Sequence, residues 1–237
     1  AILPVTDYLE VDLAVRYDNY DDFGSEVSPR VGATFTMIDN LVVKASYGQG
    51  FRAPDLSDLY GATSFSAESA KDYYGCSLDG VSEADCPDRQ FDTYIGSNPD
   101  LMAETSETMS FGVEYTYDNN WVAKVNYVTL ELQNANEYVS AQDMLNVDRN
   151  TGGNNPQVDR NSLGAVTEIR AGYQNAVNDV QRQSVDLALD GTIHESDDYG
   201  TFGFRGEATK YLKFETETEF GSGILGDAVD TLGFPEW

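Results

Sequence analysis

Apolar and polar residues alternate strictly along several stretches of the chain. From Leu9 to Tyr17 every second residue is apolar, and Glu, Asp, Ala and Arg stand between them. The same period of two recurs in stretches that begin at Val31, Leu41, Met109, Trp121, Val185 and Phe202. A period of two is typical of a β-strand with one apolar face, so we predict about seven to nine strands and an all-β class.

Two kinds of antiparallel sheet fit this alternation. Each stretch is about as long as the roughly 9–11 residues that a tilted strand needs to cross a bilayer. Aromatic residues stand at strand ends, as in the girdles of outer-membrane barrels: Tyr8, Tyr17, Tyr47, Tyr117, Trp121 and Tyr127. A soluble sandwich has the same period. The apolar residues Val11, Phe35, Val43, Phe111 and Val125 point to lipid in a barrel and into a core in a sandwich.

The connections between the stretches favour the barrel. Residues 38–40 and 118–120 are short and rich in Asp and Asn, as tight hairpin turns require. Long polar stretches, at 18–26, about 55–105 and about 137–161, separate the other strands. Short and long connections alternate, which predicts an antiparallel up-and-down meander with short periplasmic turns and long external loops. Residues 148–161, rich in Gly and Asn, are expected to be a flexible external loop.

The charge of the chain excludes one class of partner. Lys and Arg number 14 and Asp and Glu number 41, which gives a formal net charge of −27. Such a surface repels nucleic acid, so we expect no nucleic-acid partner, and it suits cations or a salty exterior. No apolar run approaches the roughly 20 residues of a membrane-spanning helix.

Two cysteines, Cys76 and Cys86, lie in the first long polar stretch. In an oxidising compartment they can form one local disulfide, which is the pairing we expect. The alternative is a pair of free thiols or half of a zinc site. A zinc site needs a closer cysteine pair and further ligands, and His194, the one histidine of the chain, is far away in sequence.

Residues 28–60 carry a more specific pattern. The runs 28–35, 39–41, 44–54 and 58–60 resemble the barrel signature of TonB-dependent outer-membrane receptors. That signature is a strand, a tight turn, a second strand that ends in Gly-Phe-Arg-Ala-Pro, and a leucine–tyrosine element. The matching residues at the strand end are Phe51, Arg52, Ala53 and Pro54.

Further blocks follow in the order of the same family. One resembles the segment that re-enters the barrel after a large loop, and contains Asn98, Pro99, Leu101 and Glu104. Weaker similarities lie at 184–187 and 234–237. By this resemblance the motif residues have structural roles. Arg52 is expected to pair with Glu104, with Asp55 or with a plug domain, and Glu107 and Glu114 are expected to face that plug.

The resemblance implies an internal part of a barrel of 22 antiparallel strands in the outer membrane of a Gram-negative bacterium. It implies the barrel wall and ligand-capture loops of an active importer of a scarce solute, such as an iron chelate, cobalamin or an oligosaccharide. The implied partners are outer-membrane lipid and lipopolysaccharide, an N-terminal plug domain, TonB and the small solute. We find no plug-like sequence and no TonB box in these 237 residues.

The loop at about 55–105 is the first candidate for ligand contact. Tyr and Arg are favoured in contact surfaces because they offer large rigid rings and forked donors. The candidates are Tyr60, Tyr73, Tyr74, Arg89, Phe91 and Tyr94. The alternative is an external loop that shields the pore or meets lipopolysaccharide.

An acidic hairpin tip is a weak candidate for a calcium site. Asp18, Asp21, Asp22 and Glu26 supply the oxygen ligands that calcium prefers, but they lack the spacing of an EF-hand loop. A solvated run of charges is the alternative. No other cofactor is expected.

We expect no enzymatic activity, because one histidine provides no credible nucleophile–base set and the chain has no glycine-rich phosphate loop. Two other functions remain open. A passive porin-type channel would lack the Gly-Phe-Arg-Ala-Pro block. A secreted, calcium-binding β-sandwich adhesin would bury its apolar faces in a core.

Overall fold

The structure, a computed structural model, describes residues 1–21, 24–118 and 120–231. The strands of its larger sheet are β1 (Ile2–Thr6), β2 (Leu9–Tyr20), β3 (Gly24–Ile38), β4 (Leu41–Arg52), β7 (Glu104–Tyr117), β8 (Trp121–Gln133), β12 (Val180–Ser196), β13 (Gly200–Glu217) and β14 (Leu225–Asp227). The other elements are α1 (Leu56–Tyr60), β5 (Ser64–Ala70), α2 (Tyr73–Leu78), η1 (Glu83–Asp85), β6 (Arg89–Gly96), β9 (Asn136–Val139), α3 (Ala141–Asn150), β10 (Val158–Arg160) and β11 (Val166–Asn175). The family-like motif at 234–237 lies outside the described residues.

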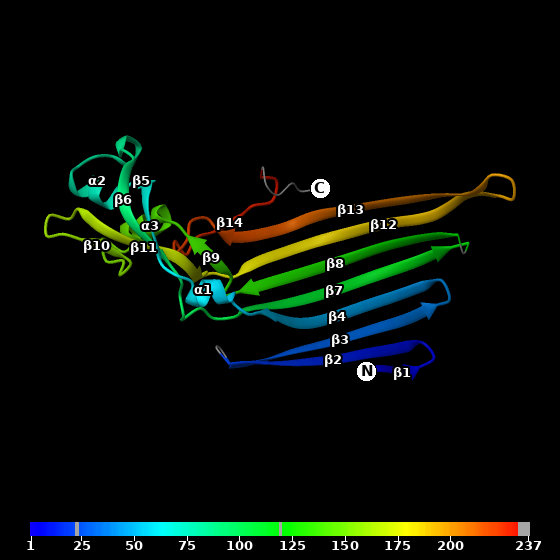
Figure 1. Cartoon of the computed structure of the whole chain (residues 1–237). Helices are drawn as coiled ribbons and strands as arrows, with labels where there is room; N and C mark the ends of the chain where they lie inside the picture. Colours follow the sequence, from blue (N-terminus) through cyan, green and yellow to red (C-terminus); the bar gives the residue numbers. More distant parts are fainter. Residues whose placement is uncertain (22–23, 119, 232–237) are drawn as a thin grey trace.

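The larger sheet is a curved wall of nine strands in the order β1-β2-β3-β4-β7-β8-β12-β13-β14 (Figure 1). We call it the wall. Every neighbouring pair in it is antiparallel, and the strands follow one another along the chain except where two long segments are inserted. The predicted all-β class and the antiparallel up-and-down meander are confirmed.

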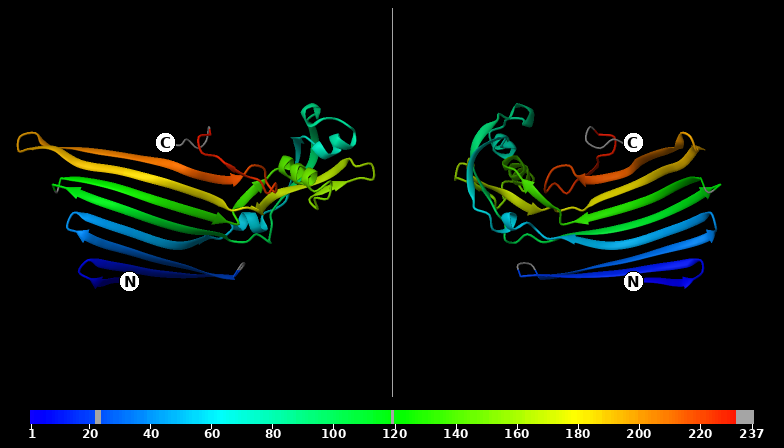
Figure 2. Two further views of the ribbon diagram at one scale, coloured as in Figure 1. Left: turned by 180° about the vertical axis from the view of Figure 1, so that it is seen from behind. Right: turned by 45° about the vertical axis from the view of Figure 1, so that its right-hand side comes forward.

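The alternation of the sequence gives the wall one apolar and one polar face. Across the strands, Val11, Ala33, Ala45, Phe111 and Tyr127 stand in register in one row. The apolar residues stay exposed: Phe35 keeps 44%, Phe111 52% and Val125 48% of its surface accessible. In the part of the chain that the structure describes, no second sheet covers this face (Figure 2). The exposed apolar residues therefore fit the barrel and not the sandwich.

The polar face of the wall carries charged residues that pair across strands. Lys44 Nζ lies 2.9 Å from a carboxylate oxygen of Glu114, and Lys124 Nζ approaches the same oxygen at 3.9 Å. Glu107 does not belong to this face. Residues 107 and 114 are an odd number of positions apart, so their side chains point to opposite sides of β7, and Glu107 lies beside Met109 and Phe111. The expectation that both glutamates face a plug is therefore wrong for Glu107.

Connections of different length gather at the two ends of the wall. One end has the short turns at 7–8, 39–40 and 197–199 and the short connection from β7 to β8 (Figure 1). The other end has two long segments, 53–103 between β4 and β7 and 134–179 between β8 and β12. The prediction of a long loop at 18–26 is wrong, because β2 continues to Tyr20 and β3 starts at Gly24.

The second inserted segment is longer than the stretch 137–161 that was expected to be a loop. The chain rejoins the wall only at Val180, because β9, β10 and β11 belong to a separate small sheet. Residues 148–161 are also not one flexible loop, since they hold the end of α3 and all of β10. In the described parts of the chain, no helix has the length and apolar character needed to cross a bilayer.

Candidate functional site: a pocket in the external loop body

The two long segments fold together at one end of the wall, and we call residues 53–103 and 134–179 the loop body. A small sheet in the order β10-β11-β6-β5 lies at its centre, with β9 also paired to β11. Helix α3 packs on this sheet and forms the hydrophobic core that contains Val139, Met144, Leu145 and Ile169. Every buried apolar residue of the described chain lies in the loop body. The wall therefore has an exposed apolar face, whereas the loop body has a protein core.

Helix α3 begins at a capping box that its sequence encodes. The Ser140 hydroxyl accepts the backbone N–H of Asp143, and the Asp143 carboxylate accepts the backbone N–H of Ser140. Arg149, in the last turn, binds Glu83 at 3.4 Å and Glu219 at 2.9 Å. The helix thus holds the first long segment and the β13–β14 connection against the second long segment.

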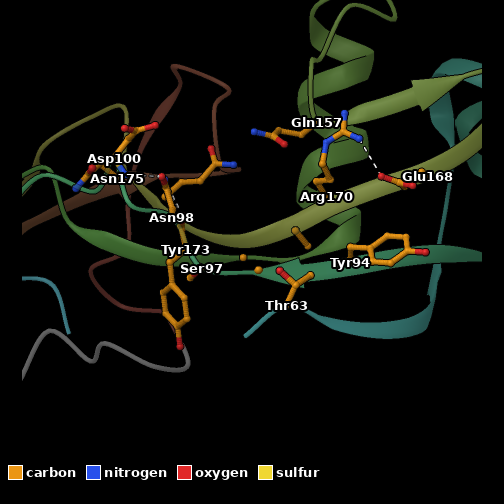
Figure 3. Close-up of a pocket in the computed structure, with 14 residues that line it drawn as sticks. Thr63, Tyr94, Ser97, Asn98, Asp100, Gln157, Glu168, Arg170, Tyr173 and Asn175 are labelled. Atoms are coloured by element: carbon orange, nitrogen blue, oxygen red, sulfur yellow. Dashed lines mark hydrogen bonds and ion pairs between the residues drawn. The ribbon is translucent and has the colours of Figure 1, made fainter. Parts of the chain in front are cut away.

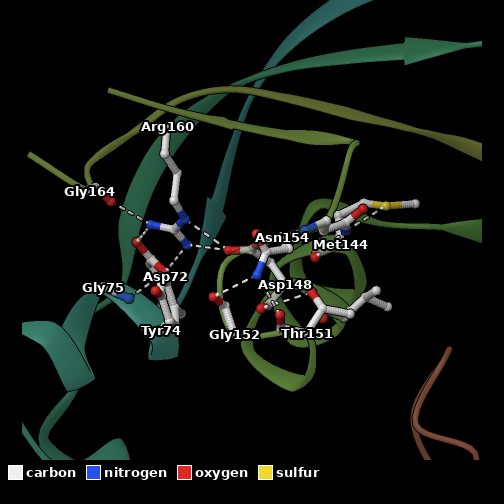
Figure 4. Close-up of polar contacts among 12 residues, drawn as sticks. Asp72, Tyr74, Gly75, Met144, Asp148, Thr151, Gly152, Asn154, Arg160 and Gly164 are labelled. Carbon is white, nitrogen blue, oxygen red and sulfur yellow. Dashed lines mark hydrogen bonds and ion pairs between the residues drawn. The ribbon is translucent and has the colours of Figure 1, made fainter. Parts of the chain in front are cut away.

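A buried ion cluster joins the two long segments (Figure 4). The Arg160 guanidinium donates to both oxygens of Asp72 at 2.7 and 2.8 Å, and to Asp148 at 2.6 and 2.8 Å. Asp148 is fully buried, and the Arg160 side chain is 9% exposed and lies 5.0 Å from the centre of the Tyr74 ring. Burial acts to raise the pKa of Asp72, but hydrogen bonds from Arg160 and Gly75 and the charge of Arg160 lower it overall.

The predicted disulfide is confirmed. Cys76 and Cys86 are bonded, with 5.9 Å between their Cα atoms, and both are buried. The bond closes the tip that carries the end of α2 and η1. It lies next to Asp72, because the backbone carbonyl of Asp72 accepts the backbone N–H of Cys76 at 2.9 Å. The tip is thus joined to the ion cluster at Asp72.

A pocket of about 710 Å³ lies in the loop body, between β6 and β11 of the small sheet and the connection that follows β6 (Figure 3). This volume is within the range of small-molecule sites. Polar side chains and three small residues of β6 and β11 line it: Thr63, Tyr94, Gly96, Ser97, Asn98, Asp100, Gln157, Glu168, Arg170, Ala171, Gly172, Tyr173, Gln174 and Asn175. Gly172 has φ +140°, and a Cβ atom there would lie 2.2 Å from the carbonyl oxygen of Gly96. A glycine is therefore required where β6 and β11 meet in parallel.

Arg170 is the basic residue of this lining, and the donors of its two terminal nitrogens are occupied. Its two terminal nitrogens donate to Asp159 at 2.7 and 3.1 Å, to Glu168 at 2.9 Å and to the carbonyl of Pro156 at 2.7 Å. The hydrogen bond to Asp159 is the main cause that raises the pKa of Arg170 above its usual value. The carboxylate of Asp100, on the opposite side of the pocket in Figure 3, has no partner among the described residues.

The six predicted ligand-contact residues are not brought together. Tyr94 lines the pocket, and its ring packs edge-on against Phe65 with 5.5 Å between centres. Tyr73 and Tyr74 lie on α2 beneath Arg149 and Arg160, and Phe91 packs against the hydrophobic core. Tyr60 is exposed at the end of α1, and Arg89 lines a smaller cavity beside the disulfide. Contact with a ligand stays a prediction for all six.

The family-like motif residues connect the wall to the loop body. Arg52 pairs with Glu104 at 2.9 Å, one of the partners that the sequence offered, and Glu104 also accepts the backbone N–H of Asn136. Asn98 donates to the carbonyl of Tyr173 at 3.1 Å. Phe51 packs edge-on against Tyr20, Pro54 and Leu101 are buried, and Ala53 and Pro99 lie in the adjoining turns.

Sequence reasoning missed Arg160, Arg170 and Asn175. Asn175 donates from its amide nitrogen to the carbonyls of Met102 and Asn134 and to Asn136, and so joins the residues just before β7 to those just after β8. The three residues come from the half of the second segment that was taken for a loop or left out of it. No short motif marks them, because their partners lie up to 88 positions away in sequence.

The calcium site at the acidic hairpin stays a prediction. Asp18 pairs with Arg16 at 2.7 Å and stands opposite Glu26 in the β2–β3 ladder. Asp22 lies outside the described residues. Within the described ranges, no group of three or more His, Cys, Asp or Glu side chains is placed to hold a metal ion.

Comparison with known proteins agrees with this architecture. A family model described as the β-barrel of TonB-dependent receptor-like proteins matches residues 1–236. The chain therefore belongs to this family of Gram-negative outer-membrane receptors. The porin and adhesin alternatives are set aside by the same match.

Two kinds of relative can be named within the family. The ferric enterobactin receptor PirA of Pseudomonas aeruginosa is 30% identical over 126 residues, which is 51% of this chain and 14% of that protein. Among solved structures, a variant of the ferric enterobactin receptor PfeA of the same organism has a TM-score of 0.63 and 20% identity, over 90% of this chain and 25% of that one.

The solved siderophore receptor PirA of Pseudomonas aeruginosa gives a TM-score of 0.59 at 18% identity, and covers 92% of this chain and 36% of that one. At these identities the likeness concerns the fold. The chain spans only 14% of the curated relative and about a quarter to a third of the solved receptors.

Proposed function

We propose that this chain is the wall and part of the external capture surface of a receptor that imports a ferric siderophore, an iron chelate, with energy from TonB. The observation that carries the proposal is the pocket of about 710 Å³ in the loop body, at the end of the wall that bears the long connections. The names of the similar proteins, which are siderophore receptors, favour an iron chelate over cobalamin or an oligosaccharide.

The wall and the loop body have separate roles in this proposal. The exposed apolar face of the wall contacts outer-membrane lipid, and lipopolysaccharide surrounds its outer rim. The polar face, with Lys44, Glu114 and Lys124, contacts a plug domain inside a barrel of 22 strands. The loop body binds the chelate before it reaches the plug. Calcium at the β2–β3 hairpin belongs to the same proposal as an optional stabiliser of the outer rim.

The experiment is iron uptake by the full-length receptor in a Gram-negative host that lacks its own siderophore receptors. Cells that express the receptor are expected to accumulate radioactive iron from a panel of ferric siderophores only when TonB is present. Equal uptake with and without TonB would instead indicate passive diffusion. Failure to take up or bind any ferric chelate would overturn the proposal.

A further inference from the structure

The loop body is strongly acidic. Residues 53–103 and 134–179 carry 16 Asp and Glu side chains against five Lys and Arg, a formal balance of −11. This is a large share of the chain's net charge of −27. A surface of one sign raises the local concentration of ligands of the opposite sign and repels those of the same sign.

The positive charges of the second long segment are already neutralised. Arg149 contacts two glutamates, Arg160 contacts two aspartates, and Arg170 contacts Asp159 and Glu168. The remaining two basic residues, Lys71 and Arg89, are outside the lining of the large pocket. The described loop body therefore offers no unpaired cation to a ligand in that pocket.

The free charges in the pocket are negative. Among the described residues, Asp100 has no partner for its carboxylate, and Glu168 uses only one of its two oxygens, to accept from Arg170. Arg170 has all four hydrogens of its terminal nitrogens in use, so it cannot clamp an anion without losing bonds to Asp159, Glu168 or Pro156. Tyr94 stands opposite Arg170 in the β6–β11 ladder and adds a π-face that attracts cations.

We propose that this receptor selects a ferric chelate that is neutral or positively charged, that Asp100 contacts its cationic group, and that Glu168, on the other side of the pocket, adds to the negative potential there. The inference rests on the proposed function and specifies its substrate class. A ferric tris-hydroxamate that bears a protonated amine has this chemistry. A ferric tris-catecholate is a trianion and would be repelled by the carboxylates in the pocket. We therefore do not expect this chain to bind the ferric enterobactin for which its relatives are named.

The test compares three chelates on the full-length receptor in outer-membrane vesicles. The probes are a ferric tris-hydroxamate with one free amine, the same chelate with that amine acetylated, and a ferric tris-catecholate. We expect binding in that order of affinity. The gap between the first two is expected to shrink when salt rises from about 0.1 M to 1 M, because the Debye length falls from about 10 to about 3 Å.

Matched variants assign the effect to the pocket. Asp100→Asn is expected to weaken binding of the amine-bearing chelate by about two- to fivefold, the range of a partly exposed ion pair, and Glu168→Gln, across the pocket, is expected to weaken it less. Neither variant is expected to weaken the acetylated chelate. Asp88→Asn removes an exposed carboxylate of the same loop body outside the pocket and is the control, with unchanged affinity.

Tighter binding of the tris-catecholate, or equal affinity for the two hydroxamates at low salt, would overturn the inference and leave the proposed function standing. Binding of none of the three, without iron uptake from any siderophore, would overturn the proposed function itself. A loss of affinity in Asp88→Asn equal to that in Asp100→Asn would show a general surface charge effect and would also overturn the inference.

Discussion

Arg160 is the residue on which the loop body depends most. Its guanidinium neutralises Asp72 of the first long segment and the fully buried Asp148 of its own segment. When one partner of a buried ion pair is removed, the other charge is left desolvated and uncompensated. The same pair exposed to solvent contributes little. Burial therefore decides how much each arginine contributes to the stability of the loop body.

Arg160→Met is expected to destabilise the loop body by about 3–5 kcal/mol, as for other broken buried pairs. Hydrogen exchange of the full-length receptor measures this as faster exchange in α2, α3 and β10, with the wall unchanged. Arg170→Met is the control, because Arg170 and Asp159 are 40% and 52% exposed. This variant is expected to destabilise the loop body by only about 0–1 kcal/mol. Equal effects of the two variants would contradict the role given to burial.

The lowered pKa of Asp72 makes the ion cluster sensitive to acid. A carboxylate whose pKa is lower in the folded than in the unfolded protein stabilises the fold above its unfolded pKa, and this stability is lost as the pH falls through the folded pKa. Exchange protection in α2 and β10, corrected for intrinsic amide rates, is expected to hold from about pH 7 to 5 and to fall below about pH 4. Asp72→Asn is expected to remove this pH dependence. Loss of protection already at neutral pH would exclude Asp72 as its cause.

At the scale of elements, a lysine is expected to affect the stability of the barrel differently on the two faces of β8. Val125 lies on the apolar face and Asn126 on the polar face. Val125→Lys is expected to destabilise the barrel by about 2–4 kcal/mol, since it places a charge in the lipid-facing band. Asn126→Lys is expected to be tolerated. Folding into lipid vesicles, followed by heat-modifiable gel migration, compares the two, and equal folding of both variants would contradict the assigned faces.

The disulfide acts on one tip of the loop body. Replacing both cysteines by serine is expected to destabilise the tip between Cys76 and Cys86 by about 2–4 kcal/mol, because the unfolded segment gains conformational freedom. Limited proteolysis with mass spectrometry is expected to show new cleavage within 77–85. Cleavage throughout the loop body would mean that the bond supports the hydrophobic core as well.

The wall could be predicted from the sequence, but the loop body could not. The strands of the wall repeat one period over 12 to 18 residues, apart from the two short edge strands, and each pairs with a neighbour along the chain. In the loop body the strands have three to ten residues, and β6 pairs in parallel with β11 about 75 positions later. That pairing follows from a shared core around Ile169, which no local pattern encodes. One local signal was present, the Ser140–Asp143 capping box before Met144 and Leu145.

The candidate site was only partly accessible to sequence reasoning for the same reason. Composition pointed to the aromatic-rich first segment, and Tyr94 does line the pocket. More than half of the lining, including Arg170 and Asn175, comes from the second segment. The family-like block correctly offered Glu104 as a partner of Arg52, since both stand at strand ends that are paired in register.

At the scale of the whole molecule, a curved wall without a core carries a small body with one. The wall leaves its apolar face exposed, whereas the loop body holds its own shape through α3, the ion cluster and the disulfide (Figures 1 and 4). Such a body is suited to present a preformed pocket outside the membrane. Preformed sites bind with less loss of conformational entropy than flexible loops do.

A bulky side chain placed in the pocket tests most directly whether the loop body captures the solute. Ser97 lines the pocket, and Ser162 is exposed in the β10–β11 turn outside it. In the full-length receptor, Ser97→Trp is expected to lower the affinity for the ferric chelate and the TonB-dependent iron uptake by at least about tenfold, because the ring occupies the space of the ligand. Ser162→Trp is expected to leave both unchanged. Binding and uptake by Ser97→Trp at the level of the unmodified receptor would contradict the central claim that the loop body captures the imported solute.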